Sequence, residues 1–296
     1  MTRELRVGLV GCGRIAERGY MPALARAAGV ELVAVADIEP ARCAAVAPGV
    51  PAFDSLLALV AEAGPEALVV ATPPSTHLAV ARLAAEAGLP VLVEKPPAAD
   101  AGEARELAGL EPHPWIGFNR RFEPALQRLK ARVPASGPLA LTLEFTYERA
   151  SWDAHVGSGD ALLDLGAHLV DLARWLTGGE VAAARAEAVE ERRATVRLEL
   201  DRGAVRIAVA SDRPYRERCE IRDGGGRVVG RYVAGGLPRR LLGRLRPSRE
   251  HLLVPSLAAQ LEAFAGAVRG EPAPLLGTAL DGLAVMEAID AARRTI

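Results

Sequence analysis

Hydrophobic residues in the first part of the chain fall into short runs separated by helical segments. Runs that are nearly continuous in apolar residues are typical of strands covered on both faces of a parallel sheet. We predict such strands at Val7 to Val10, Leu32 to Ala36, Leu68 to Ala71, Val91 to Val93 and Trp115 to Phe118. Helices are expected near residues 14–28, 41–47, 54–63, 75–88 and 99–109, with Asp54 as an N-cap and Gly88 as a C-cap. This alternation predicts a Rossmann-type, doubly wound α/β domain over residues 1–119.

After residue 120 the pattern changes to strict alternation of apolar and polar positions, which is typical of half-buried strands. Strands are expected at residues 139–147, 193–200, 204–210, 217–222 and 227–233, and helices near 160–176, 256–269 and 277–294. We therefore predict an α+β domain over 120–296, an open, mainly antiparallel sheet with helices on one face, and leave open whether the last helix packs back on the first domain. The open face would expose Leu143, Val196 and Leu198, which predicts a homodimer or homotetramer.

Composition and charge narrow the classes of partner. Of 296 residues, 50% are hydrophobic and 25% are charged, and the formal net charge is −1, so no overall field attracts nucleic acid or an anionic membrane. The three cysteines are far apart and form no CxxC pair, which favours a reducing compartment. We see no signal peptide and no apolar run long enough for a membrane span, and we expect a cytoplasmic protein.

A glycine-rich segment, Gly11-Cys12-Gly13-Arg14-Ile15-Ala16, lies between the first strand and the first helix. Gly11 suits a tight turn, Gly13 lets the backbone approach a diphosphate, and the first turn with Arg14 and Ile15 offers free N–H groups to that anion. Asp37 ends the second strand, where a carboxylate binds the ribose hydroxyls and repels a 2′-phosphate, so NAD(H) is favoured over NADP(H). The alternative is a glycine turn that only packs the helix on the strand.

Five motifs in a fixed order give the chain a family resemblance. Besides the glycine-rich loop they are Ala71-Thr72-Pro73-Pro74-Ser75-Thr76-His77, Val93-Glu94-Lys95-Pro96, Gly117-Phe118-Asn119-Arg120-Arg121-Phe122 and Asp164-Leu165-Gly166-Ala167-His168-Leu169-Val170-Asp171. Together they resemble the glucose-fructose oxidoreductase/inositol dehydrogenase/MocA (Gfo/Idh/MocA) family. The resemblance implies an NAD(P)-dependent oxidoreductase that acts on CH–OH groups of sugars, cyclitols or related polyols.

The resemblance maps catalytic roles onto Lys95, Asp164 and His168. Oxidation of an alcohol requires hydride loss from carbon and proton loss from oxygen, and histidine titrates near neutral pH. Asp164 lies four residues before His168 and is expected on the same helical face, where it could orient the imidazole. Lys95 ends a parallel strand, where its ammonium could stabilise a developing alkoxide. The alternatives are a surface or capping ion pair for Asp164 and His168, and a solvated strand end for Lys95.

Other positions are expected to bind cofactor or substrate. The resemblance places Thr72, Pro73 and His77 in a loop beside the dinucleotide and Glu94 at its nicotinamide end, and we predict a cis peptide bond before Pro96. The candidate substrate contacts are Asn119, Arg120, Trp152 and His155. Arg120 equally fits an interdomain ion pair, and Trp152 a core or lid position. We predict no metal site, and we interpret the arginine-rich segment 238–249 as a solvated loop rather than a phosphate site.

Three functions remain open from the sequence. The first is hydride transfer with Lys95, Asp164 and His168 as the reactive residues. The second is an NAD-dependent glycosidase of the same family, which would oxidise its substrate transiently and produce no net NADH. The third is a non-catalytic NAD-binding regulatory or scaffold protein, for which loss of the lysine or histidine would be the expected sign.

Overall fold

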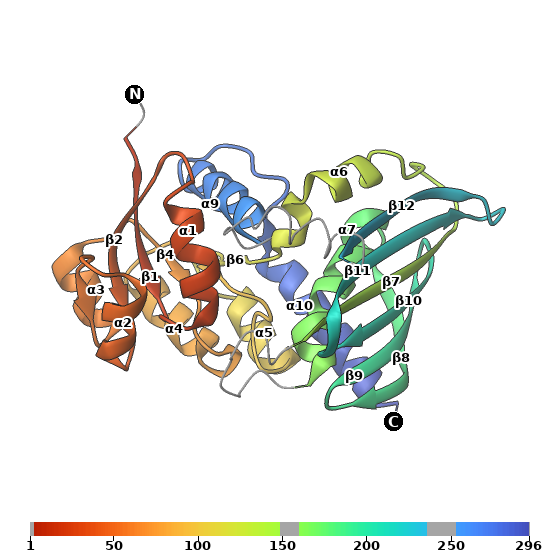
Figure 1. The fold of residues 1–296 in the computed structure, drawn as a ribbon, viewed down its shortest axis with the longest axis horizontal. Helices are drawn as coiled ribbons and strands as arrows, with labels where there is room; N and C mark the ends of the chain where they lie inside the picture. The colour runs from red at the N-terminus through yellow and green to blue at the C-terminus, as the bar shows by residue number, and fades with distance from the viewer. Residues whose placement is uncertain (1–2, 149–159, 236–252, 296) are drawn as a thin grey trace. The chain divides into compact units, whose positions relative to one another are not determined.

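The computed structural model describes residues 3–148, 160–235 and 253–295. They form two compact units (Figure 1). Unit 1 comprises Met1–Phe122 and Glu250–Leu283, and unit 2 comprises Glu123–Arg249 and Ala284–Ile296. Helix α10 (Ala279–Arg293) begins in unit 1 and ends in unit 2.

Unit 1 is built around a seven-stranded sheet with the order β13-β6-β5-β4-β1-β2-β3. All neighbouring strands are parallel except β13 and β6. The strands are β1 (Leu5–Val10), β2 (Val30–Ala36), β3 (Ala52–Phe53), β4 (Ala67–Val70), β5 (Val91–Val93), β6 (Trp115–Ile116) and β13 (Gly277–Thr278). The chain leaves β1 toward β2 on one side and later returns to β4 on the other, which is the strand-order reversal of a Rossmann fold.

Helices cover the sheet of unit 1, and the predicted fold class is confirmed. A π-helical turn (Ala16–Tyr20) continues into α1 (Met21–Leu24), and α9 (Val254–Val268) packs against both. Leu257, Leu261 and Phe264 of α9 join the core formed by the residues of β1 and β2. The remaining helices are α2 (Pro40–Val46), α3 (Leu56–Ala63), α4 (Pro74–Glu86), α5 (Ala101–Ala108) and a 3₁₀ turn, Asn119–Phe122.

Two of the predicted helix caps were wrong by one residue. Ser55, not Asp54, is the N-cap of α3, because its hydroxyl accepts a hydrogen bond from the Ala58 N–H at 3.3 Å. Helix α4 has its C-cap at Ala87, and Gly88 follows it with a φ of 69°. Glycine is suited to that position because it adopts the left-handed conformation without a steric cost from Cβ.

Unit 2 contains a six-stranded sheet with the order β12-β11-β7-β10-β9-β8. Only β7 and β10 run parallel, so the sheet is mainly antiparallel as predicted. The strands are β7 (Leu139–Glu148), β8 (Val181–Glu190), β9 (Arg193–Leu200), β10 (Gly203–Ala210), β11 (Asp212–Asp223) and β12 (Val228–Gly235). Strand β8 was not predicted; its sequence is mostly alanine and charged residues, and the pairing with β9 forms it.

Helix α7 (Ala167–Thr177), preceded by a π-helical turn (Leu162–Gly166), packs on one face of this sheet, and α6 (Pro124–Lys130) contacts β12 and α7 (Figure 1). Leu143, Val196 and Leu198 are at most 1% exposed, so the expectation that they lie on an open face was wrong. The alternate positions of the same strands carry polar side chains, such as the exposed Thr142 and Arg197. The alternation of apolar and polar positions was therefore predicted correctly, but the apolar side chains belong to the core of this chain.

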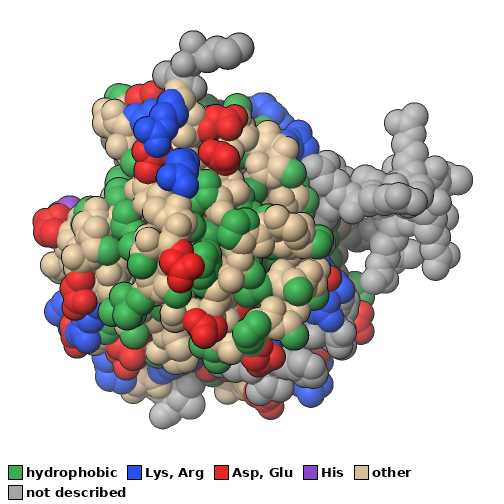
Figure 2. All heavy atoms as spheres, turned by 90° about the vertical axis from the view of Figure 1, so that its left-hand side faces the viewer, with side chains coloured by type: hydrophobic (Ala, Val, Ile, Leu, Met, Phe, Trp, Pro, Cys, Tyr) green, Lys and Arg blue, Asp and Glu red, His purple; other side chains and the backbone are tan. Residues whose placement is uncertain are grey.

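The surface of unit 1 is mixed in charge where Figure 2 displays it. On the side where α2 and α3 lie in Figure 1, hydrophobic side chains alternate with scattered basic and acidic ones. Among the helices of the described residues, none combines the length and the hydrophobicity needed to cross a bilayer.

Candidate active site

The predicted cofactor, catalytic and substrate residues of unit 1 follow the carboxyl ends of five neighbouring parallel strands. Gly11 follows β1, Asp37 follows β2, Thr72 follows β4, Lys95 follows β5 and Asn119 follows β6. Because these strands are parallel, their carboxyl ends share one edge of the sheet. Ligands of open α/β sheets bind at this edge, beside the strand-order reversal.

The glycine-rich loop packs directly against the loop that follows β4. Gly11 has a φ of +97°, and a Cβ added there would lie 2.7 Å from the Ala71 carbonyl carbon. Gly13 differs, because a Cβ added to it would meet no atom within 4 Å from the rest of the described chain, its two neighbours in the sequence aside. The buried hydroxyl of Thr72 has no hydrogen-bond partner in the described part of the chain. Open space over Gly13, an orphaned hydroxyl nearby in the fold and the start of a helix fit a dinucleotide diphosphate.

Asp37 is held by two main-chain groups. Its Oδ2 accepts a hydrogen bond from the Cys12 N–H at 2.8 Å, and its Oδ1 accepts one from the Glu39 N–H at 2.9 Å. The carboxylate is therefore fixed beside the glycine-rich loop, and the next side chain, Ile38, is 87% exposed. This arrangement places a fixed negative charge where the sequence predicted the ribose contact.

Cys12, inside the glycine-rich loop, is a buried residue of the core. Its sulfur lies 3.6 Å from that of Cys43 on α2. Burial, and after it the hydrogen bond with Cys43, raises the pKa of the Cys12 thiol to about 12. A thiol in this state is a poor nucleophile, so we assign Cys12 a packing role and no reactive one.

His77 joins two of the loops at this edge. Its Nδ1 lies 3.0 Å from the Pro96 carbonyl oxygen and its Nε2 lies 2.8 Å from the Thr72 carbonyl oxygen. Burial lowers the pKa of His77, and its contacts with the backbone of Thr72, Pro96 and Pro97 partly oppose that shift. His77 thus fixes the Thr72 loop and the turn after Lys95 relative to each other.

Glu94 and Lys95 begin the turn after β5, and the Lys95–Pro96 peptide bond is cis as predicted. The Glu94 side chain is buried; its Oε1 accepts a hydrogen bond from the Tyr20 hydroxyl at 2.7 Å and its Oε2 accepts one from the Lys95 N–H at 2.9 Å. The carboxylate therefore contacts residues of this chain on both of its oxygens.

The residues after β6 are buried. Asn119 donates a hydrogen bond from Nδ2 to Ser256 Oγ of α9 at 3.3 Å, and Arg120 is 5% exposed. Arg121 forms an ion pair with Asp281 at 3.2 Å and lies over the Phe118 ring, 5.7 Å from its centroid. Arg14, which directly follows Gly13 in the glycine-rich loop, forms an ion pair with Glu17 at 2.6 Å. Arg121 has a structural role within unit 1.

Unit 2 carries the second predicted group of reactive residues. Asp164 lies within the π-helical turn and accepts a hydrogen bond from the Tyr147 hydroxyl of β7 at 3.0 Å. His168, in the first turn of α7, is 8% exposed, and its ring packs against Phe145 with centroids 5.9 Å apart. Asp160 caps the turn, since its Oδ1 accepts the Leu163 N–H at 2.9 Å while its Oδ2 pairs with Arg293 at 2.8 Å.

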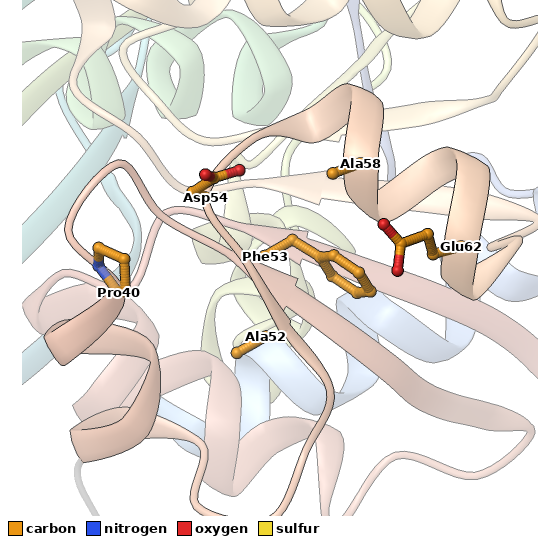
Figure 3. A pocket seen from close by; sticks show the side chains of 6 residues that line it. All are labelled: Pro40, Ala52, Phe53, Asp54, Ala58 and Glu62. Atoms are coloured by element: carbon orange, nitrogen blue, oxygen red, sulfur yellow. The ribbon is translucent and has the colours of Figure 1, made fainter.

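Some predicted features fall elsewhere. Trp152, His155 and the arginine-rich segment 238–249 lie outside the described residues. A hollow of about 360 Å³ in unit 1 is lined by Pro40, Ala52, Phe53, Asp54, Ala58 and Glu62 (Figure 3). Its lining includes none of the predicted site residues, so we assign it no part in this site. No group of three or more potential metal ligands is present in residues 3–148, 160–235 and 253–295.

Two tyrosines near the reactive residues were missed by the sequence analysis. Tyr147 was assigned only to a strand, although its two-residue spacing from Phe145 already placed it on the face toward the helix. Tyr20 lies 74 positions before its partner Glu94, and no local pattern indicates a contact over that distance.

Models of known protein families match both parts of the chain. Residues 5–113 match an oxidoreductase family with an NAD-binding Rossmann fold, and residues 130–226 match the GFO/IDH/MocA C-terminal domain. The rhizopine catabolism protein MocA of Rhizobium meliloti is 31% identical over an alignment 314 positions long, which covers 99% of this chain and 95% of that protein. An inositol 2-dehydrogenase of Corynebacterium glutamicum is 32% identical over 193 residues, 62% of this chain and 57% of that one.

One solved structure shows the same fold along the whole chain. The apo scyllo-inositol dehydrogenase of Lactobacillus casei superimposes with a TM-score of 0.82 at 19% sequence identity, covering 100% of this chain and 97% of that one.

Proposed function

The chain belongs to the Gfo/Idh/MocA oxidoreductase family, and from this premise we propose that it transfers a hydride between NAD(H) and a secondary alcohol or ketone of a sugar, cyclitol or related polyol. The observation that supports the cofactor assignment best is the glycine-rich loop. At Gly13, beside the first turn of a helix, there is space that no side chain of the described residues fills. The inositol dehydrogenase among the relatives supports the substrate class.

The residues of unit 1 would hold the dinucleotide. Gly11, Gly13 and the first helical turn would bind the diphosphate, and Asp37 would bind the adenosine ribose. Thr72 would contact the remainder of the dinucleotide through its hydroxyl, which has no hydrogen-bond partner among the described residues. We propose NAD(H) over NADP(H), because the fixed Asp37 carboxylate would repel a 2′-phosphate. When bound, the nicotinamide supplies the hydride acceptor or donor.

The residues of this chain would handle the proton. In the oxidative direction the alcohol loses a hydride from carbon and a proton from oxygen, which leaves a ketone. We propose that His168 takes the proton, that Asp164, held by Tyr147, orients the histidine, and that the Lys95 ammonium stabilises the negative charge on the substrate oxygen. Asn119 and Arg120, together with Trp152 and His155, are proposed as substrate contacts.

A direct screen tests the proposal. NAD⁺ with polyols, inositols and sugars, or NADH with keto-sugars, should give a change in the absorbance of reduced nicotinamide for at least one compound. Parallel reactions with NADP(H) test the cofactor preference. Cleavage of a glycoside without net NADH production would favour the glycosidase instead, and NADH binding without any turnover would favour a regulatory protein.

We also propose that the protein forms a homodimer or homotetramer. Because Leu143, Val196 and Leu198 are covered within the chain, a subunit contact on this sheet would use its opposite face, where exposed charged side chains such as Arg197 and Arg206 pair with Glu187. Light scattering should then give a mass two or four times the chain mass of 31.1 kDa. A monomer at micromolar concentration would contradict this assignment.

A further inference from the structure

Three motifs of unit 1 meet at one buried carboxylate, that of Glu94. Its Oε1 accepts the Tyr20 hydroxyl at 2.7 Å, and its Oε2 accepts the Lys95 N–H at 2.9 Å. From a third direction Gly117 approaches, and a Cβ added there would lie 3.3 Å from the Glu94 carboxyl carbon. The glycine-rich loop with its helix, the Lys95 turn and the loop after β6 therefore share this group.

Tyr20 is the member of this set that comes from the cofactor-loop helix. It is fully buried and is the last residue of the π-helical turn, which is closed by a hydrogen bond from the Met21 N–H to the Ala16 carbonyl. A π turn inserts an extra residue and so changes which side chain faces the sheet. The local helix distortion thus accompanies the contact between Tyr20 and Glu94.

The chemistry of the pair fixes the direction of the hydrogen bond. Burial, and after it the charge of Glu94, raises the pKa of Tyr20 well above its usual value. The phenol therefore stays protonated and donates, while Glu94 accepts. A buried carboxylate is expensive unless its oxygens receive hydrogen bonds, so Tyr20 supports the charge that in turn holds the Lys95 main chain.

We propose that Tyr20 is a positioning residue that fixes Lys95 through the carboxylate of Glu94. The proposal rests on the role assigned above to Lys95. It links the helix that would bind the diphosphate to the residue that would stabilise the substrate oxygen. In this proposal Tyr20 contacts neither the diphosphate nor the substrate. It acts by limiting the orientations available to Glu94 and hence to the Lys95 peptide.

The alternative is that Tyr20 only fills the core, which phenylalanine would do equally well. Tyr20→Phe keeps the ring and removes the donor, and Glu94→Gln alters the acceptor. Tyr232→Phe, on strand β12 of unit 2, is the matched control for the loss of a phenol. Each variant is first compared with the wild type in thermal unfolding and in NADH binding by fluorescence.

The first measurement requires no substrate. Hydrogen exchange of the Lys95 amide should be about tenfold faster or more in Tyr20→Phe and in Glu94→Gln, because the acceptor of that amide is no longer fixed. Exchange in the Val91–Val93 strand serves as an internal reference and should not change, and Tyr232→Phe should resemble the wild type. Wild-type exchange at Lys95 in Tyr20→Phe would overturn the proposal.

The second measurement is turnover on a substrate found in the screen. We expect kcat of Tyr20→Phe to fall about tenfold with an unchanged dissociation constant for NADH, and the double variant with Glu94→Gln to be no slower than Glu94→Gln alone. Fully additive losses would contradict a path through Glu94. If Tyr20→Phe does not fold, Gly117→Ala crowds the same carboxyl, since the added Cβ would lie 3.3 Å from its carbon and its Oε1, and should also accelerate exchange at Lys95.

The two proposals fail in different ways. If Lys95→Ala retains wild-type turnover, the catalytic role proposed for Lys95 is wrong, whatever effect Tyr20→Phe has on amide exchange. If Lys95→Ala loses turnover while Tyr20→Phe keeps both turnover and slow exchange, only the positioning role of Tyr20 is wrong.

Discussion

Tyr147 donates a hydrogen bond to Asp164, with 3.0 Å between Oη and Oδ2. The bond connects strand β7 with the π-helical turn before α7, and Phe145, two residues earlier on the same strand, packs against His168. One strand therefore positions both members of the predicted Asp164–His168 pair.

Tyr147→Phe should lower kcat about tenfold, because a hydrogen bond to a charged group contributes about 1.5–3 kcal/mol and the carboxylate would lose its orientation. The NADH dissociation constant should not change. Steady-state kinetics and fluorescence titration give the two numbers, with Tyr232→Phe as the control. An unaltered kcat would show that Tyr147 has no part in orienting Asp164.

Lys95→Ala and His168→Ala should each reduce turnover by about a hundredfold or more, since each removes a group that acts on the substrate oxygen. Both variants should still bind NADH, because neither contributes to the diphosphate or ribose contacts. Turnover within a few-fold of the wild type would remove that residue from the mechanism. Arg128→Ala, on α6, is a suitable control for the loss of a basic side chain.

The two glycines of the cofactor loop should respond differently to alanine. Gly11→Ala places a Cβ 2.7 Å from the Ala71 backbone at a positive φ and should cost about 1–3 kcal/mol of stability. Gly13→Ala meets no protein atom within 4 Å, so unfolding should change little while NADH affinity falls about tenfold or more. Thermal unfolding and binding titration separate the effects. A Gly13→Ala variant with wild-type affinity would contradict the diphosphate assignment.

Asp37→Ser should shift the preference from NAD toward NADP by about tenfold or more, because it removes the charge that repels a 2′-phosphate. The ratio of kcat/KM for the two cofactors measures the shift. Glu39→Gln is the matched control, since Glu39 is a nearby carboxylate that pairs with Arg42 at the surface. An unchanged ratio in Asp37→Ser would show that Asp37 does not determine the cofactor preference.

Stability should fall on mild acidification because of His77. Its pKa is lowered from 6.5 in the folded protein by burial, whereas in the unfolded chain the ring binds a proton near 6.5. Below about pH 6.5 the unfolded state therefore binds more protons, and the free energy of unfolding decreases by up to about 1.4 kcal/mol per pH unit. Urea titrations of the wild type and His77→Asn test this, and an equal slope in both would exclude His77.

A second pH window belongs to Glu220. Arg231, and to a lesser degree Arg218 and Arg222, lowers the pKa of Glu220 from 4.5 to about 2. Its contribution is complete above 4.5 and is lost as the pH falls toward 2, so it does not overlap with the onset of the His77 effect.

The sequence by itself determined the fold class, the positions of β1, β2, β4, β5 and β6 and the local motifs, because hydrophobic periodicity and the glycine-rich loop depend on neighbours in the chain. The two-residue strands β3 and β13 were not predicted, since they are too short to show a pattern. Caps were assigned less well, since Asp54 and Ser55 compete for one N-cap and only backbone geometry selects Ser55. The division into residues 1–119 and 120–296 and the roles of the site residues stay predictions.

Only the tertiary structure decided which distant residues meet. Leu143, Val196 and Leu198 form a stripe that the sequence identifies, but whether α7 or another subunit covers it depends on packing. Tyr20 and Glu94 are separated by 74 positions, and their contact exists because parallel strands bring the ends of distant segments to one edge. The local pattern of apolar and polar residues predicts whether a side chain is buried. Which distant residue that side chain contacts depends on the path of the whole chain.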